Sequence, residues 1–507
     1  MDLTPLLQQC LQELYKTQLI HLLVFSSLLF LLIFALKSFK GSRKFNFPPS
    51  PPGLPIIGHM HLLGTLPHKS LHTLFQTYGP IFFLSLDRAS TIVVTSAEIA
   101  KEIMKTQDVT FSDRVQTRAA KILMYGCRDL AFSPHGEYWR QMRKICVLQL
   151  LSLNRVQSFR SLREEEVAGL IERIRGASLH GAPINLGELF VQLSSSMIAR
   201  SILGRKYEGE SNKKRFRQLS RSALEQMGEF CFWDFFPSLG WMDVLTGFIK
   251  RLKDTSKGLD VFLDEMIEEH RSSKGNDDQP EKNCFIEILL QLQKEGMMGM
   301  DIARDRTDTT SATMEWAMSE LMKNPTKMRK AQEEVRRVVG RKHGVDQDDI
   351  DQMDYLKCVV KETLRLHPPA PFLIPRELNG SAKLGSYDIP PKTRLFINVW
   401  AIQRDPKLWD RPDDFLPERF ANTQIDFHGK EFQFIPFGAG RRGCPGISFG
   451  VTEVEHVLAN LLYWFDWKPL SGADGKDLDM SEAFGLVVHK KILLQLVPVK
   501  HSPEFLK

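Results

Sequence analysis

The segment from 437 to 446, FGAGRRGCPG, contains the residue types most capable of chemistry in this chain. As a thiolate, Cys444 would be a strong electron donor to iron and would need positive charge and shielding around it. Arg442 can supply the charge, Phe437 can cover the loop, and Pro445 restricts the backbone just after the cysteine. The pattern predicts a loop that binds haem iron through Cys444; the alternative is an ordinary glycine-rich surface turn. Glycines that would let the backbone fold tightly under a flat ring are Gly438, Gly440, Gly443 and Gly446.

This segment resembles the haem-binding loop of the cytochrome P-450 family, the haem-thiolate monooxygenases, and especially the microsomal plant A-type. The resemblance extends over nearly the whole chain. It implies a mainly α fold with a smaller β portion, preceded by one N-terminal transmembrane helix. It also implies haem b as cofactor, Cys444 as axial iron ligand, and Phe437, Gly440, Arg442 and Gly446 as parts of the haem-binding loop.

Haem carboxylates in a largely apolar pocket need cationic partners. In HGEYWRQMRK, Trp139 and Arg143 are four residues apart and share one helical face, and their spacing resembles the family's motif on the helix over the haem. Arg376 in LIPRE and Arg442 are further candidates. Exposed arginines are common, so the prediction depends on these residues occurring together with Cys444.

A Glu/Arg pair lies in KETLR, where Glu362 and Arg365 are three residues apart on one helical face. Such pairs are usually exposed and contribute little to stability. Downstream, FLPERF contains Arg419. By resemblance, Glu362, Arg365 and Arg419 form the family's buried triad, which has a structural role in holding the segment that leads into the haem loop.

The segment TDTTSATMEW resembles the oxygen-activating part of the family's long central helix. The resemblance assigns Thr309 as the alcohol and Asp308 as the acid of a proton relay to the distal side of the haem. The alternative is an ordinary helix start, because Asp and Thr are common first-turn residues.

The residues just before that segment depart from the family pattern. Asp305 and Arg306 occupy positions where the family has a small residue and a glycine. A helix from Asp301 to Lys323 would place Thr309 only about two turns from its start, so about three turns of apolar helix are missing. The hypothesis is a splice variant, an erroneous gene prediction or a natural internal deletion. The missing helix turns would affect oxygen activation but not haem ligation.

The N-terminal region predicts a membrane anchor. Residues 19–36 have no formal charge and would form a helix of roughly 27 Å, enough to cross a bilayer core. A basic cluster follows the run, which predicts a cytosolic catalytic domain at the endoplasmic reticulum membrane. A cleaved signal peptide is the alternative, but the basic cluster lies on the wrong side for it. The predicted organisation is a lumenal N-terminus (1–18), an anchor (19–36), a basic and proline-rich hinge (37–55) and the catalytic domain (56–507).

Composition narrows the possible function classes and the cellular compartment of this protein. The net charge of +6 in 507 residues is modest and spread along the chain, which argues against nucleic-acid binding. Seven scattered cysteines without CxxC spacing suit a reducing compartment. Periodicity predicts helices at Glu164–Ile174, Lys250–His270, Trp316–Val339 and Tyr355–Leu366, and strands at Ile81–Leu86, Thr91–Val94, Arg394–Val399 and Ile492–Val497.

Substrate recognition is the least specific prediction. By resemblance, the pocket walls include mostly apolar residues, which suits a lipophilic small molecule, although the same residues could be plain core. An aromatic cluster at 230–241 either contacts the membrane or packs in the core. The pocket candidates are Ala312, Thr313, Phe372, Leu373, Phe484 and Leu486.

The family resemblance also implies the partners. Dioxygen and a lipophilic substrate, expected to be a plant specialised metabolite, would react with electrons from an NADPH-dependent cytochrome P-450 reductase. Arg140, Lys144 and Arg441 would contribute to a basic docking patch on the thiolate side. Two alternatives stay open: a haem-binding protein without oxygenase activity because of the shortened helix, and a haem-thiolate isomerase or dehydratase.

Overall fold

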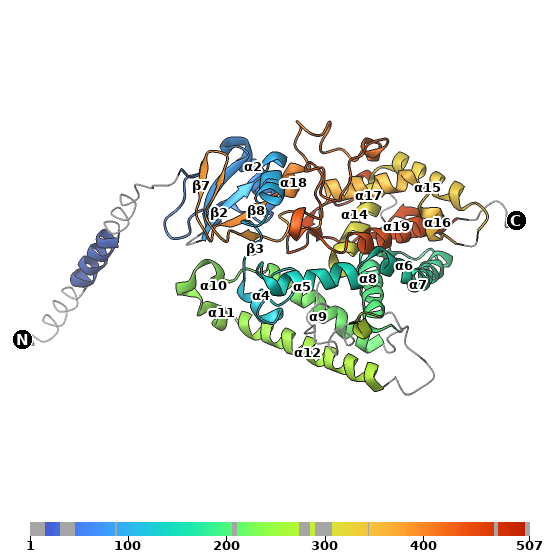
Figure 1. Ribbon diagram of the computed structural model, residues 1–507, viewed down its shortest axis with the longest axis horizontal. Coiled ribbons are helices and arrows are strands. Elements are labelled where there is room, and N and C mark those ends of the chain that lie inside the picture. Colours follow the sequence, from blue (N-terminus) through green and yellow to red (C-terminus); the bar gives the residue numbers. More distant parts are fainter. Residues whose placement is uncertain are drawn as a thin grey trace, which may run out of the picture.

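Helices dominate the structure, and a smaller β portion lies to one side of them (Figure 1). The computed structural model describes residues 16–30, 46–86, 89–204, 210–272, 284–288, 307–342, 344–470 and 475–501. The predicted mainly α fold with a smaller β portion is confirmed. The larger helices are α2 (Pro67–Tyr78), α5 (Glu137–Ile145), α7 (Arg160–Leu179), α8 (Leu186–Leu203), α9 (Glu210–Gly228), α12 (Phe248–Ser272), α14 (Thr307–Lys323), α15 (Pro325–Val339), α17 (Asp354–Leu366) and α19 (Ile447–Trp464).

Shorter helices connect these elements. They are α3 (Ala97–Lys101), α4 (Arg118–Leu123), α6 (Leu153–Ser158), α10 (Phe232–Phe235), α11 (Met242–Leu245), α16 (Gln347–Ile350) and α18 (Val399–Ile402).

The main sheet has the strand order β1-β2-β8-β5-β3. Strands β1 (Ile81–Leu86) and β2 (Ala89–Val94) are antiparallel, and β2 pairs in parallel with β8 (Arg394–Ile397), which joins segments about 300 residues apart in sequence. Strand β5 (Arg376–Glu377) then pairs with β8 and with β3 (Asp113–Arg114). The sheet therefore joins residues 81–114 to residues 376–397, and β3 lies at one edge.

The other strands form small accessory sheets. Strand β12 (Gln495–Lys500) lies between β4 (Ile184–Asn185) and β9 (Phe465–Pro469). The remaining antiparallel pairs are β6 (Ala382–Leu384) with β7 (Tyr387–Ile389), and β10 (Glu482–Ala483) with β11 (His489–Lys490).

The helical core is built around α14, which contacts α8, α15, α17 and α19. Met314, Ala317, Met318 and Leu321 are buried on one face of α14, and Ala312 and Trp316 are buried on the opposite side. Apolar residues lie on several sides of this helix, which is typical of a central helix rather than an amphipathic surface helix. Burial of these side chains fixes the position of α14 relative to α17 and α19, the two helices next to the predicted haem loop and triad.

Several predicted elements need correction at their ends. The predicted helix Trp316–Val339 is two helices, because Asn324 interrupts it and Pro325 starts α15, where its missing N–H costs nothing. The predicted strand Arg394–Val399 ends at Ile397, and Val399 begins α18, whose first turn is capped by the Asn398 side chain. The predicted strand from Ile492 begins only at Gln495. The other predicted helices and strands are confirmed.

The N-terminal residues bear on the predicted anchor. Residues 16–30 are helical, and their apolar side chains are exposed, among them Leu22 and Phe25 at 70% and 69%. Among the described residues, no helix is both long and apolar enough to cross a membrane. The second part of the predicted span, 31–36, lies outside the described residues, as do Asp301 to Arg306 of the unusual segment before α14. The predicted anchor and the predicted domain boundaries therefore stay predictions.

The proline-rich segment is held against the sheet. The N–H of Phe83 donates to the carbonyl of Pro49, and the Nε2 atom of buried His59 lies 2.8 Å from the carbonyl of Pro51. The N–H of Ser85 donates to Nδ1 of His59 at 2.7 Å. This segment therefore forms an ordered strap along β1.

Candidate haem-binding site

The loop that contains Cys444 is shaped by two glycines with positive φ. Gly438 has φ 70° and Gly440 has φ 67°, a region that favours glycine. A Cβ on Gly440 would lie 2.1 Å from the carbonyl oxygen of Met104, so a side chain there would displace the backbone. The N–H of Cys444 donates to the carbonyl of Phe437 at 2.9 Å and closes the loop. Gly446, with φ −96°, is the N-cap of α19 and needs no special conformation.

Cys444 differs from the other described cysteines because it is exposed, whereas the other five are buried. Burial raises the pKa of Cys127 and of Cys231 to about 12 and also raises the pKa values of Cys284 and Cys358, so these thiols stay protonated. Cys444 lies two residues before the N-cap of α19, where the helix dipole favours negative charge. The site therefore suits a metal-binding thiolate.

Two buried arginines face each other across neighbouring strands of the sheet. Arg114 of β3 is paired in register with Arg376 of β5, and the two residues are 6% and 3% exposed. Arg376 donates to Oδ1 of Asp108 at 3.1 Å, while Arg114 donates to the carbonyls of Ala131 and Ile374. Like charges directly opposite on antiparallel strands are destabilising. This pair therefore calls for a compensating anion.

A third buried arginine, Arg442, extends this cluster. Its guanidinium donates to the carbonyls of Ser112 and Ser133 at 2.7 and 2.6 Å and lies 4.1 Å from the centre of the Trp139 ring. Burial, followed by the charge of Arg376, lowers the pKa of Arg442 to about 9. Arg143, on the same helix as Trp139, lies 5.6 Å from that ring. The predicted residues Trp139, Arg143, Arg376 and Arg442 are thus brought together.

Electrostatics show that this arginine cluster fits a dianion. Burial, and then Arg376 and Arg442, lower the pKa of Arg114 well below its ordinary value. Burial also raises the pKa of nearby Asp129, which reduces the negative charge available to offset the arginines. A group with two carboxylates would compensate these buried cations through charge-assisted hydrogen bonds. The residues present therefore fit haem: Cys444 would bind the iron, and the arginine cluster would hold the two carboxylates.

Two residues of this site were missed in the sequence. No local motif singles out Arg114, since its place beside Arg376 follows from the β3–β5 pairing. Asp108 is 4% exposed, and its Oδ2 accepts the backbone N–H of Arg441 at 2.8 Å. Asp108 thus links the haem loop to Arg376. In the sequence, the sign of these two residues is only that Asp108 and Arg114 flank the apolar Phe111, which is a weak signal.

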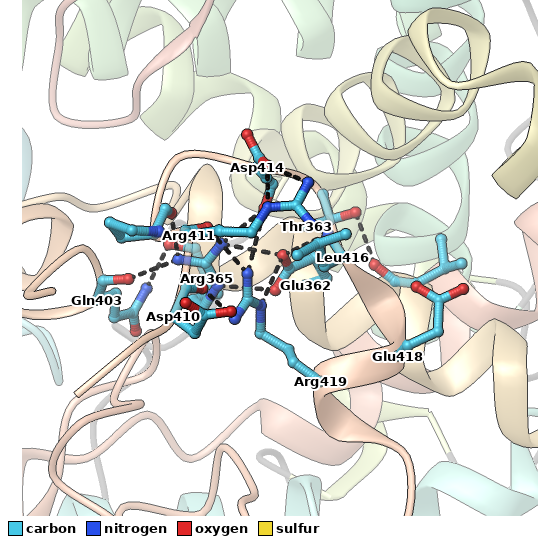
Figure 2. A network of polar contacts seen from close by, with 12 residues as sticks. Glu362, Thr363, Arg365, Gln403, Asp410, Arg411, Asp414, Leu416, Glu418 and Arg419 are labelled. Atoms are coloured by element: carbon cyan, nitrogen blue, oxygen red, sulfur yellow. Dashed lines mark hydrogen bonds and ion pairs between the residues drawn. The ribbon is translucent and has the colours of Figure 1, made fainter.

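The predicted triad residues are in contact (Figure 2). The carboxylate of Glu362 accepts from Nε and Nη2 of Arg365 at 2.7 and 2.9 Å and from Nε of Arg419 at 3.0 Å. Arg365 also donates to the carbonyls of Gln403 and Pro412. Glu362 and Arg365 are fully buried. The triad therefore ties α17 to the 403–419 segment that precedes the haem loop.

The predicted oxygen side is only partly defined. Thr309 is exposed, and its carbonyl accepts from the hydroxyl of Thr313 at 2.8 Å. The side chain of Asp308 lies outside the described residues. Thr310 is 9% exposed, and a Cβ on Gly450 of α19 would lie 3.7 Å from its hydroxyl. Here α14 closely approaches the helix that follows Cys444, but the relay of Thr309 and Asp308 stays a prediction.

The candidate pocket residues lie in three segments of the chain. Ala312 and Thr313 are buried on α14. The ring of Phe372 packs 6.3 Å from that of Phe484, next to the sheet. Leu373 has φ 55°, and its Cδ1 would lie 3.4 Å from a Cβ on Gly438, so it touches the haem loop. Leu486 packs instead against the apolar cluster around α4.

The aromatic segment 230–241 is partly packed in the core and partly exposed. Phe235 packs against the core beneath the sheet, and the rings of Phe230 and Phe235 stack at 5.2 Å. Trp233 and Trp241 are 49% and 58% exposed.

The predicted docking residues Arg140, Lys144 and Arg441 are all exposed. Arg140 pairs with Glu137 at 2.6 Å and Arg441 lies 3.4 Å from Asp108.

Comparisons with known proteins identify the family of this chain. Residues 48–496 match the family model described as cytochrome P-450. The chain is 49% identical over 478 residues to the phenylacetaldehyde oxime monooxygenase of Prunus mume, covering 91% of this chain and 90% of that protein. It is 47% identical over 482 residues to desmethylyatein synthase of Sinopodophyllum hexandrum, covering 93% and 97%.

A solved structure shows the same fold. A zebra fish cytochrome P-450 with progesterone superposes with a TM-score of 0.73 at 24% identity and covers 85% of this chain and 99% of its own. The exposed Cys444 beside a buried arginine cluster, the triad and the family match over most of the chain lead to one assignment. The chain belongs to the cytochrome P-450 family and is a haem-dependent monooxygenase, an oxidoreductase.

Proposed function

We propose that this protein is a membrane-anchored monooxygenase that inserts one atom of dioxygen into a lipophilic small molecule of plant specialised metabolism. Its electrons would come from NADPH through the membrane-bound cytochrome P-450 reductase. The observation that carries the proposal is the exposed Cys444 in a glycine-shaped loop beside buried Arg114, Arg376 and Arg442. This arrangement supports a thiolate-bound haem.

Haem, when bound, supplies the iron at which dioxygen is activated. The chain supplies the surroundings. Cys444 would be the axial ligand, and the arginine cluster would hold the two carboxylates. Gly440 lets the loop pass against Met104, and Asp108 holds the loop through the N–H of Arg441. The triad fixes the segment before the loop, so the sulfur is positioned before any ligand binds.

The substrate side supports an apolar molecule. Phe372, Leu373 and Phe484 present apolar surface, and Leu373 touches the haem loop at Gly438. The relatives named for phenylacetaldehyde oxime and desmethylyatein support aromatic specialised metabolites as the first class to test. Thr309 and Asp308 are proposed to move protons on this side. Thr310, which is buried next to α19, is a second hydroxyl for that role.

Membrane association is proposed at the endoplasmic reticulum. The exposed apolar side chains of residues 16–30 support the first contact. A second contact is supported by exposed Trp241, Val244 and Leu245, at 58%, 62% and 75%. Exposed Arg140 and Lys144 on α5 support docking of an acidic face of the reductase near Cys444.

The test is reconstitution of the full-length protein with the reductase in lipid vesicles. A thiolate-type Soret band of the reduced, carbon-monoxide-bound protein, together with NADPH-dependent oxidation of an aromatic oxime, is expected. The band without NADPH consumption for any substrate would favour the haem-binding protein without oxygenase activity. Conversion of an already oxidised substrate without NADPH would favour the isomerase or dehydratase. Loss of the band in Cys444→Ala, but not in Cys231→Ser, is expected; a band that survives in Cys444→Ala contradicts the ligand assignment.

A further inference from the structure

Two aromatic rings from different elements lie face to face beside the central helix. The indole of Trp316 on α14 and the imidazole of His367, just after α17, have ring centres 4.1 Å apart and planes 2° apart. Trp316 is 1% exposed. Nε2 of His367 also lies 2.8 Å from Oε1 of Glu320, one turn further along α14. The imidazole is therefore held both by stacking and by a hydrogen bond.

A third element, β11, also contacts Trp316. Lys490 on β11 is buried, and its Nζ lies 5.2 Å from the centre of the Trp316 ring. The N–H of Val488 donates to the carbonyl of Pro369 at 2.8 Å. The β11 segment is thereby joined to α14 through Trp316 and to the segment after α17 through Pro369. We name Trp316, His367 and Lys490 the three-element stack.

Each member of the three-element stack is close in sequence to one wall of the candidate pocket. Thr313 precedes Trp316 by three residues, slightly less than one helical turn. Phe372 follows His367 by five residues. Phe484 and Leu486 precede Lys490. Rigid packing between the members fixes the relative positions of the elements that carry these walls.

We propose that Trp316 and His367 are positioning residues that set the spacing of the pocket walls and so determine the length of substrate that can be accommodated above the haem. This inference rests on the proposed function, because the walls are proposed from that function. Neither ring belongs to the candidate walls themselves. The residues act through Thr313, Phe372 and Phe484, whose elements they hold at one distance.

Stacked rings act as a spacer because their contact distance cannot shrink and sliding is opposed by the Glu320 hydrogen bond. Burial lowers the pKa of His367, so the imidazole at neutral pH is neutral and donates from Nε2 to Glu320. Replacing the ring by a small side chain would let α14 and the 367–373 segment approach each other. The distance between their walls would then change while the Cys444 loop stays in place.

The test uses 1-alkylimidazoles from butyl to dodecyl as probes of the full-length haem protein. The imidazole head coordinates the iron, so the tail length reports the distance to the walls. Affinity is measured from the shift of the Soret band. In Trp316→Leu and His367→Ala we expect the ratio of decyl to butyl affinity to change by about tenfold, with butyl affinity unchanged within about twofold. His367→Phe keeps a stacked ring and should restore the chain-length profile even if it unfolds at a lower temperature.

Trp464→Leu is the matched control, because that indole also stacks on a cation, Arg175, at 5.0 Å but at the end of α19. It should leave the profile unchanged. Equal affinity loss for all chain lengths, or an unchanged profile in both stack variants with a normal carbon-monoxide band, would overturn the positioning role. A wild-type protein without that band would overturn the proposed function and this inference together.

Discussion

Arg114 and Arg376 are the residues whose arrangement says most about the haem site. Their side chains are buried on facing strands, and Arg442 joins them from the haem loop. Asp108 pairs with Arg376, and a ligand with two carboxylates would compensate the remaining buried positive charge. At the residue scale, the electrostatics therefore indicate a dianionic ligand.

Arg114→Met should weaken haem retention. The substitution removes one cation from the cluster and leaves the carbonyls of Ala131 and Ile374 without their donor, at a cost of about 1–3 kcal/mol in the free energy of unfolding. Transfer of haem to excess apomyoglobin should become faster. Arg221→Ala, which removes an exposed pair with Glu225, is the control and should change neither quantity. Unchanged transfer in Arg114→Met would exclude Arg114 from the haem site.

Glu453 on α19 should make stability depend on pH. Burial raises the pKa of Glu453 to about 7 from an ordinary value of 4.5, and only its Oε1 accepts a hydrogen bond, from Ser194 at 2.6 Å. The native state holds this proton while the unfolded state releases it above pH 4.5. The contribution of Glu453 to the free energy of unfolding should therefore fall as pH rises from about 4.5 to 7, by up to about 3 kcal/mol, and then level off.

Glu453→Gln should remove this dependence. The amide oxygen can still accept from Ser194, and no charge can form in the interior. Urea unfolding at pH 5 and pH 8 should show the variant gaining stability relative to the wild type at the higher pH only. Glu225→Gln, at an exposed position, should show no such difference. His456 has the opposite sign, since burial lowers its pKa to about 4, so its contribution rises with pH between about 4 and 6.5.

At the scale of elements, the triad is where one side chain holds several segments. Glu362 accepts from Arg365, Arg419 and the backbone N–H of Leu416. Glu362→Ala should leave the fully buried Arg365 without its carboxylate and cost about 3–5 kcal/mol. The expected result is a lower urea midpoint and loss of the thiolate band through displacement of the haem loop.

The control for this prediction is a surface ion pair of similar chemistry. Arg160→Ala removes the i,i+4 pair with Glu164 at 2.9 Å, where both side chains are about 40% exposed. It should change the free energy of unfolding by less than about 1 kcal/mol and leave the band intact. A Glu362→Ala protein with a normal band and midpoint would show that the triad does not support the loop.

Element positions followed from periodicity more reliably than element ends. The apolar faces of α7, α12 and α17 predict helices, and all three are present. Pro325 could have shown that the predicted helix Trp316–Val339 is two helices, because proline favours the first turn of a helix. The end of β8 at Ile397 depended on capping of α18 by Asn398, whose side chain also donates to His68 in a distant helix. Such tertiary contacts have no local signature.

At the scale of the whole molecule, the exposed apolar residues of 16–30 and of α11 support two contacts with a membrane. Leu22→Asp with Leu29→Asp in the full chain should release the protein on carbonate extraction, because each carboxylate in a spanning helix costs about 2.5–3.5 kcal/mol. Leu22→Ile with Leu29→Ile should stay with the membrane. A charged variant that resists extraction would show that these residues do not anchor the protein.

The haem site could be predicted in parts. Cys444, its glycines and the cationic candidates Arg143, Arg376 and Arg442 were identifiable because the chemistry of a thiolate and of two carboxylates demands those residue types. Trp139 was identifiable from its spacing to Arg143, which resembles the family's motif. Arg114 and Asp108 could not be, because their function depends on β3 meeting β5 and on Asp108 reaching the Arg441 N–H. The three-element stack was equally hidden, since Trp316, His367 and Lys490 meet only in the folded chain.

The amino-acid sequence by itself determined the chemistry available to this protein: a cysteine in a glycine-rich loop, arginines that can pair with carboxylates, and helices long enough to enclose a cofactor. Local spacing suffices for these features because they depend on neighbours within a turn or a loop. Tertiary structure decided which arginines are buried together, why they require an anion, and which rings separate the pocket walls. Those properties arise from pairing and packing between residues up to about 300 positions apart. Burial of the arginines is what makes binding of a negatively charged ligand favourable.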